Sequence, residues 1–292
     1  AGLHKTVQAL VPTVTNTNNV SICCGALPGE HGITGNYYFN ESSGEHDYME
    51  NADFIRIPTL LQRAQKLGVK SALLTCKRKT INLLAGGTEI AIAAEDPPAE
   101  YIERYGMPPD IYSREINYWL WQVTVDLLKN RPDIGVLYVH TTDYPMHMWA
   151  PGEAESIEHM ETLDKLHAEA AAADHDAAFF ITADHGMNYK RRCWDLEQAC
   201  RNRGVELKFA MSAENDRYVK HHRTFGGTAW VYLNSPDDRE KVAEVLRSGV
   251  IASQMGDWDP TEEITKWAEE TGKRADPPVG YAEEYRVFHT SG

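Results

Sequence analysis

The chain has 292 residues, of which 42% are hydrophobic and 10% aromatic, and it carries a formal net charge of -14. This length accommodates one large domain with an insertion or two modest ones, and the composition is that of a globular protein. The acidic excess argues against nucleic acid as a partner, because a phosphate backbone requires a basic footprint. No apolar run is long enough to cross a bilayer and no hydrophobic leader is visible, so we expect a cytoplasmic protein without a membrane partner.

Strand-like and helix-like segments alternate along the first two thirds of the chain. Pro58 and Gly68 flank the first clear helix, as expected for a residue that opens a helix and one that ends it. Continuous apolar strands separated by helices indicate a largely parallel sheet covered by helices on both faces. The predicted helices cover 59–67, 115–129 and 154–173, and the predicted strands cover 69–75, 134–141 and 177–182, the last two buried.

The pattern changes after residue 190. Two short strands are predicted over 205–211 and 228–233, and an antiparallel arrangement is open to them. The polar, basic segment between them is typical of a lid over a site. Helices are predicted over 237–247 and 260–271. We therefore divide the chain into a core over 1–190, a cap or lid segment over 191–234 and a C-terminal part over 235–292.

Five cysteines are present, and no two of them form a CxxC pair. The odd count and the absence of that spacing favour reduced thiols over a disulfide framework. A bridge between Cys193 and Cys200 is the less favoured alternative.

Two Asp–His pairs follow predicted buried strands. Asp143 and His147 come after the strand over 134–141, while Asp184 and His185 follow the strand over 177–182. Carboxylate oxygen and neutral imidazole nitrogen are both zinc ligands, and open α/β sheets place ligands at strand ends. The pairs therefore predict a two-metal site, although Asp143 and His147 taken singly are more typical of a helix cap and a surface imidazole.

A polar cluster over 11–19 (VPTVTNTNN) precedes an apolar run that can begin a helix. A hydroxyl at the start of a helix lies near its positive end, where anions are favoured. A Thr hydroxyl is nonetheless a poor nucleophile unless a base or a metal activates it. By itself the cluster is more typical of an Asn-rich turn.

Residues 11–36 together resemble the nucleophile region of the alkaline phosphatase superfamily, in its phosphodiesterase-like branch. That region reads Pro-Thr-x-Thr-x-x-Asn and then Gly-x-x-Pro-x-x-His-Gly-Ile-x-Gly-Asn, as do residues 12–18 and 25–36 here. Both Asp–His pairs follow in the order that the superfamily uses. The Lys-x-Lys at 77–79, the Asp-Tyr-x-x-His at 143–147 and residues 220–227 further resemble the members that hydrolyse phosphonoacetate.

The resemblance implies an α/β protein, a three-layer α/β/α sandwich of the alkaline phosphatase type with a smaller cap or lid subdomain. It implies zinc-dependent cleavage of the carbon–phosphorus bond of phosphonoacetate, a small anionic phosphonate, to acetate and phosphate through a phosphothreonine intermediate on Thr15. Two zinc ions per chain are implied, with Mn²⁺ or Fe²⁺ as alternatives. The implied ligands are Thr15, Asp184 and His185 for one ion and Asp143, His147 and His289 for the other.

The remaining roles that the resemblance implies concern the substrate. Asn18 is expected to donate a hydrogen bond to a phosphoryl oxygen. Lys77 and Lys79 are expected to hold the substrate carboxylate, since side chains at i and i+2 share a face in an extended segment. A solvated basic turn is an equally good interpretation of the two lysines. His221 and His222 would face the substrate from the lid or belong to a basic hairpin.

Two other functions stay open from the sequence. A phosphodiesterase or nucleotide pyrophosphatase would use the same metals and the same nucleophile with an aromatic slot for a base. A metal-poor, inactive relative is the second, because none of the fourteen residues before Thr15 is the Asp that the superfamily uses there as a zinc ligand. A homodimer is compatible with any of these functions.

Overall fold

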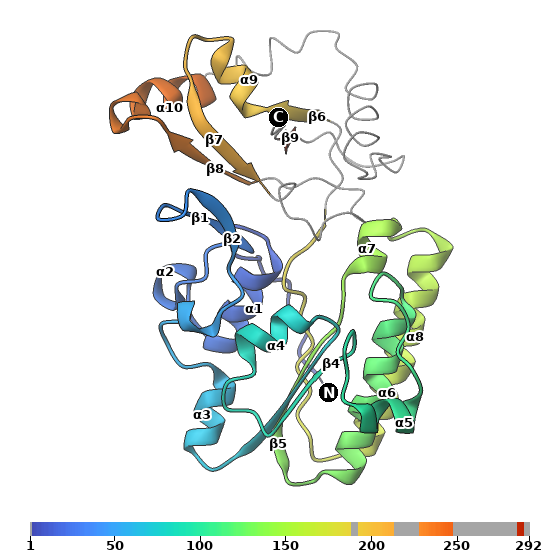
Figure 1. Ribbon diagram of the computed structural model, residues 1–292. Coiled ribbons are helices and arrows are strands. Elements are labelled where there is room, and N and C mark those ends of the chain that lie inside the picture. Colours follow the sequence, from blue (N-terminus) through green and yellow to red (C-terminus); the bar gives the residue numbers. More distant parts are fainter. Residues whose placement is uncertain (1, 188–191, 213–227, 248–284, 289–292) are drawn as a thin grey trace. The chain divides into compact units, whose positions relative to one another are not determined.

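The computed structural model describes residues 2–187, 192–212, 228–247 and 285–288 (Figure 1). Contacts divide the chain into two compact units, Ala1–Gly186 and Met187–Gly292, and each is described by itself. The division falls close to the core boundary expected at residue 190.

The first unit is built on a parallel sheet with the strand order β4-β3-β5. Strand β3 (Lys70–Thr75) lies between β4 (Ile90–Ala93) and β5 (Ile134–His140). In the register, Ala72 pairs with Ile90 on one side and with Leu137 on the other. The predictions for β3 and β5 are confirmed to within one residue, but β5 is half-buried rather than buried.

Helices cover both faces of this sheet (Figure 1). Ala72 and Leu74 of β3 pack with α6 (Glu115–Asn130), whereas Leu73 between them packs with α1 (Thr15–Cys24) and with helices α3 (Leu60–Lys66) and α4 (Arg78–Leu84). This alternation follows from the two-residue period of a strand, which sends successive side chains to opposite faces. The predicted three-layer α/β/α arrangement is confirmed.

The helix boundaries follow local signals in the sequence. Thr59 caps α3, because its hydroxyl accepts a hydrogen bond from the Gln62 N–H at 3.2 Å while the Gln62 side chain accepts from the Thr59 N–H at 2.9 Å. Gly68 ends the turn after the helix with a φ of 72°, which suits glycine. Helix α8 (Ala154–Ala173) has the predicted bounds and packs against α6. The other elements of this unit are α2 (Pro28–His31), β1 (Tyr37–Asn40), β2 (Glu45–Tyr48), η1 (Ala52–Phe54), α5 (Ala99–Tyr105) and α7 (Tyr144–Met148).

The buried strand predicted over 177–182 is wrong. The segment forms no strand, and Phe180 and Ile181 are 93% and 77% exposed. No backbone hydrogen bond joins it to another part of the described chain. A continuous apolar run predicts burial but does not supply the neighbour whose N–H and C=O groups complete a ladder.

The second unit contains the two predicted strands, and they pair in the antiparallel sense that the sequence left open. Strand β7 (Leu207–Ser212) pairs with β8 (Ala229–Leu233), and α9 (Leu196–Arg201) and α10 (Arg239–Arg247) pack beside them around Cys200, Val205 and Val242. The helix predicted over 237–247 is therefore confirmed, whereas the one predicted over 260–271 lies outside the described residues. The remaining elements are β6 (Arg192–Asp195), which pairs in parallel with β9 (Tyr285–Phe288), and η3 (Pro236–Asp238).

The described cysteines behave as the composition predicts. The free thiols are those of Cys23, Cys24, Cys76 and Cys200, all of them buried. Because Cys200 is free, the alternative bridge to Cys193 is not formed. Among the helices of the described ranges, none is both long and apolar enough to cross a membrane.

Candidate active site

Helix α1 begins at Thr15, on a loop that Asn18 holds in place. The Asn18 Nδ2 donates to the carbonyl oxygens of Leu10, Pro12 and Val14 at 3.2, 3.0 and 3.2 Å, and its Oδ1 accepts from the Leu10 N–H at 3.0 Å. The side chain is only 3% exposed. The sequence predicted that Asn18 donates to a phosphoryl oxygen. In the structure its amide hydrogens already have acceptors in the backbone.

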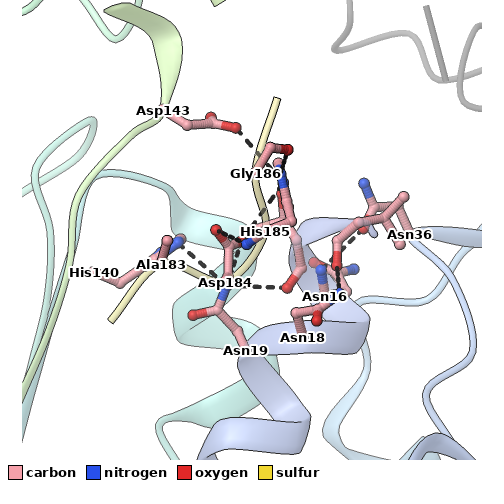
Figure 2. A network of polar contacts seen from close by, with 12 residues as sticks. Asn16, Asn18, Asn19, Asn36, His140, Asp143, Ala183, Asp184, His185 and Gly186 are labelled. Atoms are coloured by element: carbon pink, nitrogen blue, oxygen red, sulfur yellow. Dashed lines mark hydrogen bonds and ion pairs between the residues drawn. The ribbon is translucent and has the colours of Figure 1, made fainter. Parts of the chain in front are cut away.

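A second asparagine lies at the start of the same helix. Asn36 accepts the N–H of Asn16 through its Oδ1 at 3.0 Å, so its carboxamide caps the first turn that begins with Thr15 (Figure 2). The Met49 N–H donates a hydrogen bond to the Asn36 carbonyl oxygen at 2.9 Å, which fixes the backbone of Asn36. The sequence analysis missed this residue, although it is the last position of the motif that ends at Asn36.

His31 fixes the turn between α1 and Asn36. Its Nδ1 accepts the N–H of Ile33 at 3.1 Å, so the proton of the neutral ring is on Nε2, which lies 2.7 Å from Ser21 Oγ. Burial lowers the pKa of His31, which favours this neutral form. Gly32 follows with a φ of 89°, and a Cβ there would lie 2.6 Å from the Phe54 carbonyl oxygen.

The two predicted Asp–His pairs lie together. Asp143 immediately precedes α7, which brings His147 Nε2 to 3.0 Å from Asp143 Oδ2. Asp184 and His185 come from the segment that follows residue 182. His185 Nε2 lies 3.8 Å from Asp143 Oδ2 and 3.8 Å from Asp184 Oδ2, so one imidazole joins the two pairs (Figure 2).

Lys77 adds a cation to this cluster. Its Nζ lies 3.5 Å from Asp143 Oδ1, and the side chain is largely buried. Burial acts to lower the pKa of Lys77, but the charge of Asp143, with a smaller contribution from Asp184, outweighs it and leaves the pKa raised. Lys77 therefore carries a full positive charge beside the carboxylates.

The expectation that Lys77 and Lys79 share a face of an extended segment is wrong. Helix α4 begins at Arg78, so Lys79 lies in its first turn while Lys77 occupies the capping position. The short link between β3 and α4 leaves no room for an extended Lys-x-Lys segment. Both ammonium groups nonetheless act on His140. Its pKa is lowered to about 4, chiefly by burial and with smaller contributions from the two lysines, while the charges of Asp184 and Asp143 oppose the shift.

The comparisons with known proteins place the chain in a family. The model of the type I phosphodiesterase/nucleotide pyrophosphatase family matches residues 1–289. The chain belongs to that family. The expected membership in the phosphodiesterase-like branch of the alkaline phosphatase superfamily is thus confirmed, and the chain is a hydrolase.

Solved structures agree with this membership. Two structures of phosphonoacetate hydrolase from Sinorhizobium meliloti 1021, one with phosphonoformate and one with phosphonoacetate, are similar to 97% of the chain at a TM-score of 0.73, with 28% and 27% identity and 73% of the hydrolase chain covered. The inactive murine ectonucleotide pyrophosphatase/phosphodiesterase 5 in complex with AMP is similar to 83% of the chain at a TM-score of 0.54, with 13% identity and 60% of that chain covered. The second likeness shows the fold alone.

The side chains of Asp143, Asp184 and His185 have the chemistry of metal ligands. His185 Nδ1 lies 3.0 Å from the carbonyl oxygen of Gly186, which can only accept, so the proton is on Nδ1. In the neutral form of the ring, which a metal ligand requires, the Nε2 lone pair points toward carboxylate oxygens of Asp143 and Asp184, and a cation between them would stabilise this arrangement. The number of ligands is smaller than the family expectation: in the described ranges, no group of three or more His, Cys, Asp and Glu side chains is arranged to hold a metal ion.

Three predicted residues cannot be placed. His221 and His222 of the expected lid and the expected ligand His289 lie outside the described residues. The predicted site residues that the first unit does bring together are Asp143, His147, Asp184, His185 and Lys77.

Proposed function

We propose that the chain hydrolyses phosphonoacetate at its carbon–phosphorus bond and releases acetate and phosphate. The observation that carries this proposal is the Lys77 ammonium 3.5 Å from Asp143, among the Asp–His pairs. A largely buried cation at this place suits a substrate that presents a carboxylate next to its phosphonate. The likeness to structures of phosphonoacetate hydrolase that contain phosphonoacetate and phosphonoformate supports the same substrate class.

Each proposed step assigns a task to a residue of the chain. The Thr15 hydroxyl loses its proton to solvent and its Oγ attacks phosphorus, so an oxygen–phosphorus bond forms. The carbon–phosphorus bond breaks with its electron pair on the acetate carbon, which takes a proton from solvent. Water then hydrolyses the phosphothreonine and restores Thr15. Lys77, with Lys79 beside it, holds the substrate carboxylate, and the amide nitrogen of Asn36 donates to a phosphoryl oxygen near the positive end of α1.

The proposed cofactor is zinc, two ions per chain, with Mn²⁺ or Fe²⁺ as alternatives. Asp184, His185 and Thr15 would hold one ion, and Asp143 and His147 the other. A bound divalent cation would supply Lewis acidity that lowers the pKa of a hydroxyl and neutralises phosphoryl charge. A cytoplasmic location and a homodimer also stay predictions.

Replacing Thr15 tests the proposal directly. The purified protein with added zinc should release phosphate from phosphonoacetate, and Thr15→Val, which keeps the shape but removes the hydroxyl, should lose roughly 10³-fold or more of kcat. Thr13→Val is the matched control, since Thr13 is an exposed threonine of the same loop. Absence of turnover by the unaltered chain with zinc, manganese or iron would reject the function.

A phosphodiesterase activity is the second candidate, and the family-model match favours it. A ratio of kcat/KM that favours a nitrophenyl phosphodiester over phosphonoacetate would support this candidate. Zinc content below one ion per chain at saturation, together with no thermal shift on zinc addition, would instead support an inactive relative.

A further inference from the structure

Asn19 connects the nucleophile turn to the Asp–His cluster. It lies in α1, one turn after Thr15, and is 2% exposed. Its Nδ2 lies 3.0 Å from the Thr15 carbonyl oxygen, 3.1 Å from Asp184 Oδ2 and 3.3 Å from His140 Nε2 (Figure 2). Its Oδ1 accepts the Tyr138 hydroxyl at 2.8 Å. One carboxamide therefore contacts four groups from the helix, from β5 and from the segment that carries Asp184.

The chemistry of these partners fixes the orientation of the Asn19 carboxamide. The carboxylate oxygen of Asp184 and the carbonyl oxygen of Thr15 can only accept hydrogen bonds, so both must face the amide nitrogen. The amide oxygen is then left to the Tyr138 hydroxyl, which donates to it. A flipped carboxamide would set two oxygens against each other at about 3 Å, which excludes the alternative assignment.

The same orientation fixes the tautomer of His140. The Asn19 amide nitrogen has two hydrogens for three acceptors, so the longest contact, to His140 Nε2 at 3.3 Å, shares one of them. Because that nitrogen can only donate, Nε2 faces it as an acceptor, and the proton of the neutral ring is on Nδ1. That Nδ1 lies 3.2 Å from Thr75 Oγ1, which also receives the Lys77 N–H at 3.2 Å. The hydrogen bonds thus run without a break from the backbone of Lys77 to the carboxylate of Asp184.

We propose that Asn19 is a positioning residue that aligns the carboxylate of Asp184 with Thr15, and that Tyr138 and His140 lock its carboxamide in place. Asp184 is then held through both oxygens, since its Oδ1 accepts the His185 N–H at 3.0 Å while Oδ2 accepts from Asn19. Groups that orient a ligand in this way typically change metal affinity or activity 10- to 100-fold when removed. The catalytic consequence rests on the proposed function, whereas the arrangement itself does not.

The first test measures which nitrogen of the His140 ring carries the proton, and it requires neither metal nor substrate. In protein labelled with ¹⁵N-histidine, long-range ¹H–¹⁵N correlation should show His140 with its proton on Nδ1, and His140→Gln assigns the signal. Asn19→Ala removes the donor to Nε2, so the ordinary Nε2–H form should reappear. A Nε2–H ring in the unaltered protein, or a ring that does not respond to Asn19→Ala, would overturn the proposal.

The second test compares two half-buried tyrosines. Tyr138→Phe removes the hydroxyl that orients Asn19, and Tyr118→Phe removes a hydroxyl that lies 2.9 Å from His159 Nδ1, outside the site. We expect about 10-fold weaker zinc binding in a chelator competition for Tyr138→Phe and about 10- to 100-fold for Asn19→Ala, with no change for Tyr118→Phe. For phosphonoacetate, kcat should fall by similar factors while KM stays within about 2-fold.

The outcomes separate this proposal from the proposed function. Equal zinc affinity in folded Asn19→Ala and in the unaltered chain would overturn the positioning role. If Asn19→Ala does not fold, Tyr138→Phe decides in its place, because it leaves Asn19 present and removes only one hydroxyl. A chain that hydrolyses no phosphonoacetate but shows the Nδ1–H ring of His140 would overturn the function and support the positioning role.

Discussion

Lys77 is the residue at which the proposed substrate preference can be measured. Lys77→Met removes the ammonium group and keeps most of the apolar stem. In the structure that group lies 3.5 Å from Asp143 Oδ1, and the two side chains are 18% and 24% exposed. At an effective dielectric constant near 20, two unit charges at this separation attract by roughly 5 kcal/mol before any desolvation is subtracted.

The expected net effect is smaller than this gross attraction. A hydrogen bond to a charged group contributes about 1.5–3 kcal/mol after exchange with water, so loss of the contact to the substrate carboxylate should raise KM for phosphonoacetate about 10- to 100-fold. Phosphate release at varied substrate concentration gives KM and kcat together. The same substitution should have little effect on KM for a nitrophenyl phosphodiester, because that substrate has no carboxylate to hold.

Lys70→Met is the matched control for this prediction. Lys70 is the first residue of β3, the strand that ends just before Lys77. It also pairs with carboxylates, at 3.0 Å from Asp133 and 3.5 Å from Glu89. It should leave both kinetic constants within about 2-fold of the original values, as expected for an exposed ion pair. An unchanged KM for phosphonoacetate in Lys77→Met, or an equal rise for the substrate without a carboxylate, would refute the assignment of Lys77.

Two further predictions concern stability. Gly32→Ala should lower the free energy of unfolding by roughly 2–4 kcal/mol, because Gly32 has a φ of 89° and an added Cβ would lie 2.6 Å from the Phe54 carbonyl oxygen. The control is Gly29→Ala, whose Cβ meets nothing within 4 Å and whose urea midpoint should barely change. Burial lowers the pKa of His159 to about 4. Between about pH 6.5 and pH 4 the imidazole is therefore protonated in the unfolded chain but not in the native chain. The free energy of unfolding should fall by up to roughly 3 kcal/mol as the pH is lowered across that window. Urea titrations at pH 7 and pH 5 should show a smaller loss in His159→Gln than in the original chain, and an equal loss would contradict the role of this imidazole.

Local signals in the sequence were sufficient for the long helices α6 and α8 and for the strands β3 and β5. Helix α8 has the predicted bounds because its Ala- and Glu-rich composition carries a strong intrinsic helix preference. Helix α3 is marked by the capping box at Thr59 and by Gly68. The strand predicted over 177–182 was wrong because an apolar run does not reveal which strand it would have to pair with. Strand pairing is a long-range property, and a single sequence holds no direct record of it.

The chemistry of the site was easier to predict than its geometry. The residue types of the two Asp–His pairs together indicated ligand chemistry, and the structure brings both pairs together. The two lysines were assigned to an extended segment because their spacing alone does not reveal that α4 begins at Arg78. Asn18 was assigned to a phosphoryl oxygen and Asn36 was missed for the same reason: a motif names the residue types, whereas the direction of each carboxamide depends on which backbone groups surround it.

Asn19 shows why such positioning residues escape sequence reasoning altogether. An asparagine inside a helix is ordinary, and its partners His140 and Asp184 lie 121 and 165 residues further along the chain. The contact exists only because α1 packs on the sheet with its first turn at the carboxyl end of β5. Its orientation is nonetheless determined by simple rules, since acceptor-only oxygens on one side leave the carboxamide a single way to lie. A substitution at Asn19 that preserves the fold should therefore change the position of Asp184 before it changes anything else in the site.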